Sequence, residues 1–169
     1  MGKERVLVAG GAGYLGSILV PTLLNKGYKV TALDSLMHNQ HSLSECCSNS
    51  DFDFVKGDIC DEQLMSSLVP KFDIVIMLAA IVGAPACKVN PSLTQLVNYD
   101  APVAMIKKLS PAQKAIFPTT NSGYGIGEKD VFCTEESPLS PISFYGKTKV
   151  QAEKLILDSK NSISFRLAT

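Results

Sequence analysis

The sequence predicts a single α/β domain, residues 1–169, built on a doubly wound parallel sheet with helices on both faces. Short apolar runs of strand length alternate with segments of helical periodicity along the whole chain. A glycine-rich loop, residues 10–16, directly follows the first apolar run, residues 6–9. The run at 74–78 is almost entirely apolar, as expected of a parallel strand that is covered on both faces.

The predicted elements follow one another in regular order. Strands are predicted at 6–9, 30–33, 52–55, 74–78, 115–117 and 163–167. Helices are predicted at 14–25, 61–68, 91–109 and 143–157. The polar stretch 35–50 is predicted to be a loop with room for one turn of helix, and 118–141 to be a loop rich in Gly, Ser, Thr and Pro.

The helix ends carry their own signals. Lys26-Gly27 closes the first helix, because glycine tolerates the left-handed backbone that often follows a helix. Asp61 and Asn90 are expected to cap the second and third helices with their side-chain oxygens. Pro102 lies inside the third pattern, where its missing N–H should kink or break the helix.

Composition excludes several classes of function. Sixteen Lys and Arg residues balance 16 Asp and Glu residues, so the chain lacks the positive charge expected of a nucleic-acid binder. It has no apolar run long enough to span a bilayer, and we expect a cytoplasmic protein with neither nucleic-acid nor membrane partners. The five cysteines show no metal-ligand spacing, which predicts reduced thiols and no metal site.

The glycine loop has the layout of a dinucleotide-binding turn. Gly10, Gly13 and Gly16 would allow a sharp turn, a close approach of the backbone to a pyrophosphate, and tight packing of the next helix on the strand. The N-terminus of that helix would offer free N–H groups and a partial positive charge to the phosphates.

Asp34 ends the second predicted strand. A carboxylate at this position can accept hydrogen bonds from both hydroxyls of the adenosine ribose, and it would repel a 2′-phosphate. No Arg or Lys follows closely enough to compensate, so the sequence predicts NAD rather than NADP.

Tyr145 and Lys149 are four residues apart on a predicted helix, and they therefore lie on one side of it, one turn apart. A free phenol has a pKa of about 10. A nearby ammonium group and a positively charged nicotinamide ring should lower the pKa of Tyr145 toward neutrality, so that it can act as a general base. A hydroxyl near the end of the fifth strand should assist, with Thr119, Thr120 and Ser122 as candidates.

Together these features resemble the extended short-chain dehydrogenase/reductase family, in particular its NAD-dependent nucleotide-sugar epimerase/dehydratase group. The resemblance covers essentially the whole chain. It is carried by residues 10–16 (GGxGxxG), Gly57-Asp58-Ile59, Leu78-Ala79-Ala80, Asn98, 119–125 ((S/T)SxxVYG), 141–149 (PxxxYGxSK) and 166–169.

The resemblance implies a Rossmann fold, NAD as cofactor and a nucleotide-sugar as substrate. Counting back from Tyr124-Gly125 places Thr120 at the catalytic Ser/Thr position, beside the catalytic Tyr145 and Lys149. The implied cofactor-binding residues are Gly10, Gly13, Tyr14, Leu15, Gly16, Asp34, Asp58, Ile59, Leu78, Ala79, Ala80, Asn98, Tyr145 and Lys149. A homodimer formed through a helix bundle that includes the helix of Tyr145 is implied as well.

Three departures from the family pattern bear on the reaction. Met77 replaces the frequent His before Leu-Ala-Ala. Asn121-Ser122 follow Thr120 where the dehydratases carry Asp-Glu, which argues against dehydration. The chain stops at Thr169, whereas family members continue into a portion that binds the nucleotide-sugar. We therefore expect this portion to be missing and some apolar surface of the last strand to lack cover.

The sequence thus predicts an NAD-dependent nucleotide-sugar epimerase, which oxidises a sugar hydroxyl to a keto intermediate and reduces it again on the other face. Two alternatives remain open. One is an NAD-dependent dehydrogenase or reductase acting on another alcohol, and the other is a truncated NAD-binding module without catalysis.

Overall fold

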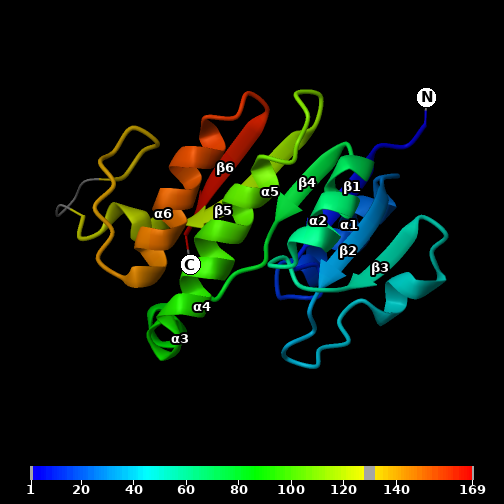
Figure 1. Ribbon diagram of the computed structural model, residues 1–169, viewed down its shortest axis with the longest axis horizontal. Helices are drawn as coiled ribbons and strands as arrows, with labels where there is room; N and C mark the ends of the chain where they lie inside the picture. The colour runs from blue at the N-terminus through cyan, green and yellow to red at the C-terminus, as the bar shows by residue number, and fades with distance from the viewer. Residues whose placement is uncertain (1, 128–131, 169) are drawn as a thin grey trace.

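The computed structural model describes residues 2–127 and 132–168 (Figure 1). Thr169, and residues 128–131 of the predicted loop 118–141, lie outside the described part. Six parallel strands form one sheet in the order β3-β2-β1-β4-β5-β6. This is the Rossmann order, and it reverses between β1 and β4, where open α/β sheets bind their ligands. The predicted fold class is confirmed.

The strand bounds agree with the apolar runs, although β5 is longer than predicted. The strands are β1 (Arg5–Ala9), β2 (Lys29–Asp34), β3 (Phe52–Lys56), β4 (Ile74–Met77), β5 (Lys114–Thr120) and β6 (Ser162–Leu167). The α-helices are α1 (Gly16–Asn25), α2 (Glu62–Leu68), α3 (Ala84–Val89), α4 (Pro91–Gln95), α5 (Ala101–Ile106) and α6 (Phe144–Leu157). The 3-10 turns are η1 (Ser44–Ser48), η2 (Val69–Lys71) and η4 (Asn121–Tyr124), and η3 (Leu96–Asp100) is a π-helical turn.

Helices cover both faces of the sheet, which explains the continuous apolar runs of the central strands. One face packs against α2, α5 and α6, which lie in front of the sheet in Figure 1, and the other packs against α1. The first core includes Leu7, Val75, Phe117, Met65, Met105 and Ile156. The second includes Val6, Val8, Val30, Val20 and Leu24. Among residues 2–127 and 132–168, no helix is long and apolar enough to cross a membrane.

The outer strand β6 is covered on one face only. Ile163, Phe165 and Leu167 alternate along the strand and are exposed, whereas Arg166 on the opposite face bonds to α6. Phe165 stands beside Pro118 of β5, so the exposed apolar surface continues onto the neighbouring strand. The apolar surface without cover that was expected at the last strand is therefore present.

The long helix differs from the prediction. Asn90 caps it as expected by accepting a hydrogen bond from the Leu93 N–H, but α4, η3 and α5 then run on without a break and end at Ile106. Pro102 does not interrupt the run. In an α-helix its ring would clash with the carbonyl of Asn98, four residues earlier, and the wider π turn at this point removes the conflict. The short helix α3, which starts after Gly83, was not predicted.

Gly10 and Gly27 provide a matched test of how tightly the loop after β1 is packed. Both have a positive φ, +83° and +88°, but a Cβ on Gly10 would lie 2.5 Å from the Ala79 amide nitrogen, whereas a Cβ on Gly27 would have nothing within 4 Å. Gly27→Ala should lower the free energy of unfolding by about 1–2 kcal/mol, through backbone strain alone. Gly10→Ala should lower it by about 2 kcal/mol more, because the added Cβ also clashes with Ala79. Urea unfolding measures both, and equal losses would contradict this packing.

Candidate functional site

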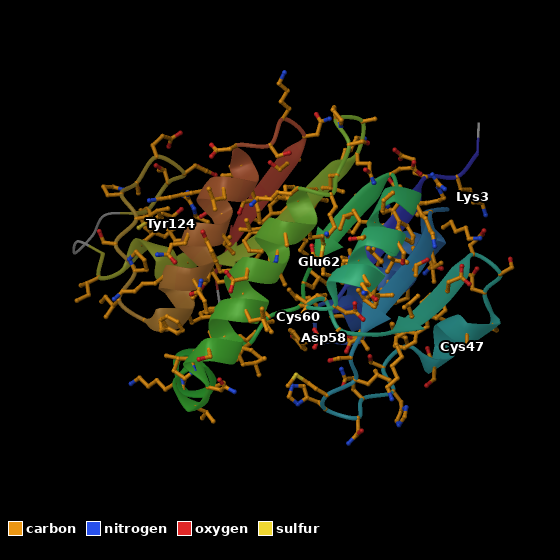
Figure 2. The ribbon with its side chains drawn as sticks, viewed as in Figure 1. Lys3, Cys47, Asp58, Cys60, Glu62 and Tyr124 are labelled. Carbon is orange, nitrogen blue, oxygen red and sulfur yellow. The ribbon has the colours of Figure 1, made fainter. Side chains whose placement is uncertain are left out.

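The carboxyl ends of the parallel strands gather most of the predicted site residues along one edge of the sheet. Gly10 follows β1, Asp34 ends β2, Leu78 follows β4 and Thr120 ends β5. In Figure 2, Asp58 and Cys60 lie near the middle of the molecule, below α2, whereas Tyr124 lies to the left, beside α6. The predicted site residues therefore extend from the β1–β4 switch point to the start of α6.

The glycine loop is bound tightly to β2. The N–H groups of Gly10 and Gly11 both donate to the Leu33 carbonyl, at 2.7 and 3.2 Å. A Cβ on Gly16 would lie 2.2 Å from the Gly11 oxygen, so helix α1 starts in direct contact with the loop. Within the part of the chain that the structure describes, no side chain caps the N-terminus of α1, and its first turn carries no acidic residue. This end of the helix therefore keeps N–H donors and a partial positive charge for an anion, and it fits a pyrophosphate.

Asp34 has a structural role that the sequence did not indicate. Its carboxylate accepts hydrogen bonds from the N–H of Ala12 at 3.0 Å, the N–H of Leu36 at 2.9 Å and the side-chain amide of Gln40 at 3.3 Å. It thereby ties the glycine loop to the end of β2. Two carboxylate oxygens have about four acceptor sites, so capacity remains for a ribose hydroxyl. The predicted contact of Asp34 with ribose stays a prediction.

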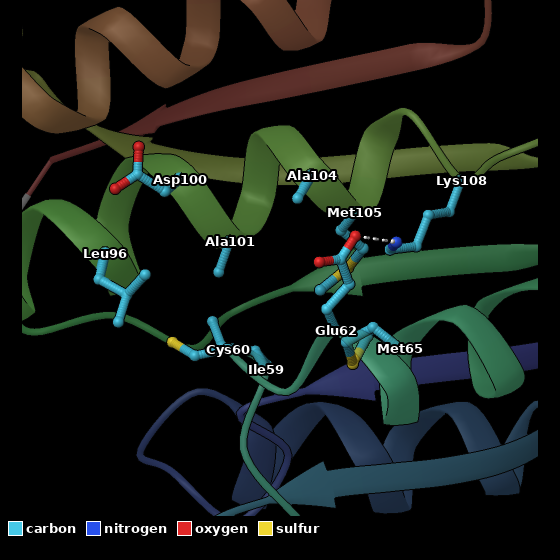
Figure 3. A pocket seen from close by; sticks show the side chains of 10 residues that line it. All are labelled: Ile59, Cys60, Glu62, Met65, Leu96, Asp100, Ala101, Ala104, Met105 and Lys108. Carbon is cyan, nitrogen blue, oxygen red and sulfur yellow. Dashed lines mark hydrogen bonds and ion pairs between the residues drawn. The ribbon is translucent and has the colours of Figure 1, made fainter.

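A groove of about 190 Å³ opens beside the predicted adenine contacts, between α2 and the helical run through η3 and α5 (Figure 3). Its walls are mainly apolar, and the Glu62–Lys108 ion pair, at 3.5 Å, lies along it. Ile59 and Cys60 lie in its lower wall in Figure 3, below Ala101. Burial and the neighbouring Asp58 carboxylate raise the pKa of the Cys60 thiol to about 12, so Cys60 stays a neutral thiol.

Asn98 fixes the loop after β4. Its side-chain amide is fully buried, accepts a hydrogen bond from the Ile81 N–H at 2.8 Å and donates one to the Ile81 carbonyl at 2.9 Å. The loop starts from Leu78 and Ala79, whose N–H groups both donate to the Ala9 carbonyl. Because both ends of the amide are engaged, Asn98 acts by positioning this loop. The predicted contact of Asn98 with the cofactor stays a prediction, since the amide keeps one N–H and one lone pair free of these two bonds.

Tyr145 and Lys149 lie on the first turns of α6, which Ser143 caps by accepting a hydrogen bond from the Gly146 N–H at 3.0 Å. The Lys149 side chain is only 3% exposed, and its Nζ lies 3.8 Å from the centre of the Phe117 ring. Burial lowers the pKa of Lys149 to about 7, while the Glu153 carboxylate acts in the opposite direction. The ring face of Phe117 stabilises the charged form of the amine.

The chain alone does not show the lowered pKa expected for Tyr145, and its lowering beside a nicotinamide ring stays a prediction. Burial, and to a smaller extent Cys87, raises the pKa of the Tyr145 phenol above its ordinary value instead of lowering it. The reason is that the half-buried phenol loses hydration, which disfavours the phenolate. The Lys149 amine is directed at Phe117 and does not offset this loss.

Thr120 lies where the predicted reacting hydroxyl is needed. Its Oγ1 lies 2.9 Å from the Ser122 Oγ and accepts a hydrogen bond from the Ser122 N–H, and η4, which begins here, packs against α6. Thr119 points to the covered face of the sheet. Its hydroxyl is buried and has no hydrogen-bond partner among the described residues. The geometry favours Thr120 with Ser122, and the catalytic assignment stays a prediction.

Sequence reasoning missed an ion pair behind this site. Arg166 on β6 donates through Nε to both oxygens of Glu153 on α6, at 3.0 and 3.3 Å. Glu153 follows Lys149 by four residues, so the helical spacing could have revealed the Lys149–Glu153 neighbourhood. The approach of Arg166 depends on the sheet and carries no local signal.

Comparison with known proteins shows which family the chain belongs to. Residues 6–168 match the model of the NAD dependent epimerase/dehydratase family. The chain belongs to this family. A UDP-glucose 4-epimerase of Cyamopsis tetragonoloba is 31% identical over 168 residues, which make up 94% of this chain and 48% of that protein. Because the family is described as NAD dependent, this match confirms the NAD dependence predicted from the sequence.

Solved structures agree with this placement. The UDP-Glc/GlcNAc 4-epimerase of Campylobacter jejuni superposes with a TM-score of 0.84 at 28% identity, covering 92% of this chain and 49% of that one. The UDP-glucuronic acid 4-epimerase of Bacillus cereus, solved in complex with NAD, gives 0.80 at 26%, covering 98% and 57%. The chain thus spans about half the length of the curated relatives that it matches.

The buried amine should make stability depend on pH in a defined direction. The pKa of Lys149 is about 7 in the fold against 10.5 for an unperturbed lysine, so between these values the unfolded chain binds more protons. The free energy of unfolding should therefore rise with pH in this window, by at most about 1.4 kcal/mol per pH unit. Urea unfolding between pH 7 and 9 measures this slope.

Lys149→Met should lose this contribution to the slope. Lys147→Met removes an exposed lysine of the same helix and should keep the wild-type slope. If Lys149→Met and the wild type had the same pH dependence, Lys149 would not be held with a lowered pKa.

Proposed function

We propose that this chain is the NAD-binding Rossmann domain, residues 1–169, of a nucleotide-sugar epimerase. The observation that carries the proposal is the position of Tyr145 and Lys149, one turn apart on α6, at the sheet edge that also presents the uncapped N-terminus of α1. A phosphate-binding end and a proton-transfer end on one edge match a reaction that needs a dinucleotide and an acid–base group together.

The cofactor would lie along this edge. Residues Gly10 to Gly16 would hold the pyrophosphate, Asp34 the adenosine ribose, and Asp58 and Ile59 the adenine. Leu78, Ala79 and Ala80 would line the loop beneath it, since Asn98 already holds the backbone of that loop at Ile81. Lys149 would bind the nicotinamide ribose through its buried amine.

Proton transfer would belong to Tyr145 and hydroxyl alignment to Thr120. When bound, NAD supplies a reversible hydride acceptor and a positive charge next to the phenol. Tyr145 takes the proton of the sugar hydroxyl during oxidation to the keto sugar and returns it during reduction. Because burial raises the pKa of Tyr145 in the chain alone, its role as base depends on positive charge brought by the ligand. If the keto sugar rotated and presented its other face before being reduced again, the carbon would be inverted, and the hydride taken up in the oxidation would be the one returned.

The substrate class is supported by relatives. Those reported above are named as 4-epimerases of UDP-sugars. The Asn121-Ser122 pair after Thr120 offers no carboxyl group for loss of water, which favours epimerisation over dehydration. The cytoplasmic location and the homodimer stay predictions.

A second candidate function is an NAD-binding module without turnover. It is supported by the uncapped N-terminus of α1, which suits a dinucleotide pyrophosphate by itself and requires no acid–base group. Calorimetry with NAD, followed by a turnover assay on UDP-, GDP- and dTDP-sugars, separates the two functions. Binding with conversion supports the epimerase, binding without conversion supports the module, and absence of NAD binding overturns both.

Tyr145→Phe tests the acid–base assignment. Removal of the hydroxyl should lower turnover by at least about 100-fold, because general acid–base catalysis contributes this much, while NAD binding is retained. Tyr28→Phe is the control, since Tyr28 lies just before β2 at the opposite edge of the sheet. Undiminished turnover in Tyr145→Phe would assign proton transfer to another group.

Asp34 is expected to set the choice of cofactor. The chain should bind NAD at least about tenfold more tightly than NADP, which corresponds to about 1.4 kcal/mol. Asp34→Asn keeps an acceptor oxygen but removes the charge that repels a 2′-phosphate. The ratio of the affinities for NAD and NADP should therefore fall. Calorimetry with both dinucleotides measures it, and an unchanged ratio would show that Asp34 does not read the ribose.

A further inference from the structure

Lys149 has a buried carboxylate within reach along its own helix. Glu153 is one turn further along α6 and only 2% exposed, and Lys149 is 3% exposed. Two such groups at helical i,i+4 spacing would ordinarily form an ion pair with each other. No salt bridge joins them in the described residues, and the Nζ of Lys149 lies over the Phe117 ring instead.

The carboxylate of Glu153 pairs with Arg166 instead of Lys149. Its Nε donates to both oxygens of Glu153, at 3.0 and 3.3 Å, so the carboxylate is oriented toward β6. Another nitrogen of the same guanidinium, Nη1, donates to the Tyr124 hydroxyl at 3.1 Å and to the Glu135 carbonyl at 2.9 Å. The guanidinium also lies 5.3 Å from the centre of the Tyr124 ring. Four attachments to three segments hold the arginine in one orientation.

Other titratable groups lie on the elements that pack around Lys149. They are Tyr145, Lys147, Glu153 and Lys154 on α6, Lys88 and Cys87 on α3, Tyr99 and Asp100 on η3, Lys114 on β5, Tyr124 on η4 and Arg166 on β6. Of these, only Glu153 has a charge that opposes the effect of burial on the amine. The charge of Lys149 therefore depends on how strongly Glu153 is engaged elsewhere.

We propose that Arg166 is a positioning residue: by pairing with Glu153 it prevents this carboxylate from pairing with Lys149, and it keeps the Lys149 amine available for a ligand hydroxyl. The inference deepens the proposed function, because it rests on Lys149 as a ligand-binding group of the site. Arg166 touches neither the amine nor the expected ligand, and it acts through Glu153 alone.

The test measures the pKa of Lys149 directly and needs no activity. NMR of protein labelled with ¹³C,¹⁵N-lysine follows the Cε and Nζ signals with pH, and Lys149→Met identifies the signal. Arg166→Gln should raise the pKa of Lys149 by at least about one unit, because Glu153 then pairs with it. Glu153→Gln should lower it, because the one neighbouring charge that raises this pKa is then gone. The double variant should match Glu153→Gln, because Arg166 acts on Lys149 only through Glu153.

A purely structural pair would behave differently. Loosening the packing in either way would hydrate Lys149, so both single variants would move its pKa upward, and this outcome would overturn the proposal. Unchanged values in both would overturn it as well. If Arg166→Gln does not fold, Arg166→Lys tests the same point. Its single ammonium cannot hold both oxygens of Glu153 in the same way, and a smaller upward shift is expected.

The measurement also separates this inference from the proposed function. A chain that turns over no nucleotide-sugar can still show opposite shifts of the pKa of Lys149 in the two variants. Conversely, an active epimerase in which Arg166→Gln leaves that pKa unchanged would keep the proposed function and remove the role of Arg166.

Discussion

The backbone of Gly10 lies so close to that of Ala79 that no side chain fits between them, and this contact is the constraint on which the site depends. It brings the loop after β1 against the loop after β4, at the point where the strand order reverses. Leu33 and Asp34 then hold the glycine loop from the other side, at the end of β2. A loop fixed between two neighbouring strands presents the N-terminus of α1 in one orientation, as phosphate binding requires.

The other end of the site follows a different principle, since burial rather than backbone contact sets its chemistry. The amine of Lys149 has lost nearly all contact with water, and the phenol of Tyr145 is partly buried. Both neutral forms are therefore favoured, which lowers the pKa of the lysine and raises that of the tyrosine. The charges of these two groups will respond strongly to any charged ligand placed beside them, because little solvent is present to screen it.

A locally unfavourable residue takes part in positioning the site. Pro102 would conflict with a regular α-helix, and the π turn η3 accommodates it without ending the helix. The centre of that turn is Asn98, whose buried amide holds the loop after β4 through Ile81. π turns inside helices are often found at functional sites, and here the turn is where a helix reaches the loop under the proposed cofactor.

The sequence by itself determined the fold class, the order of the elements, the caps at Asp61 and Asn90, and the residues that face one edge of the sheet. These follow from local periodicity and turn chemistry, which neighbouring residues specify. Only the tertiary structure decided that Asn98 positions a loop, that burial raises the pKa of Tyr145, and that Arg166 holds Glu153. Each of these depends on desolvation or on contacts between segments far apart in the chain, and neither leaves a pattern in the local sequence.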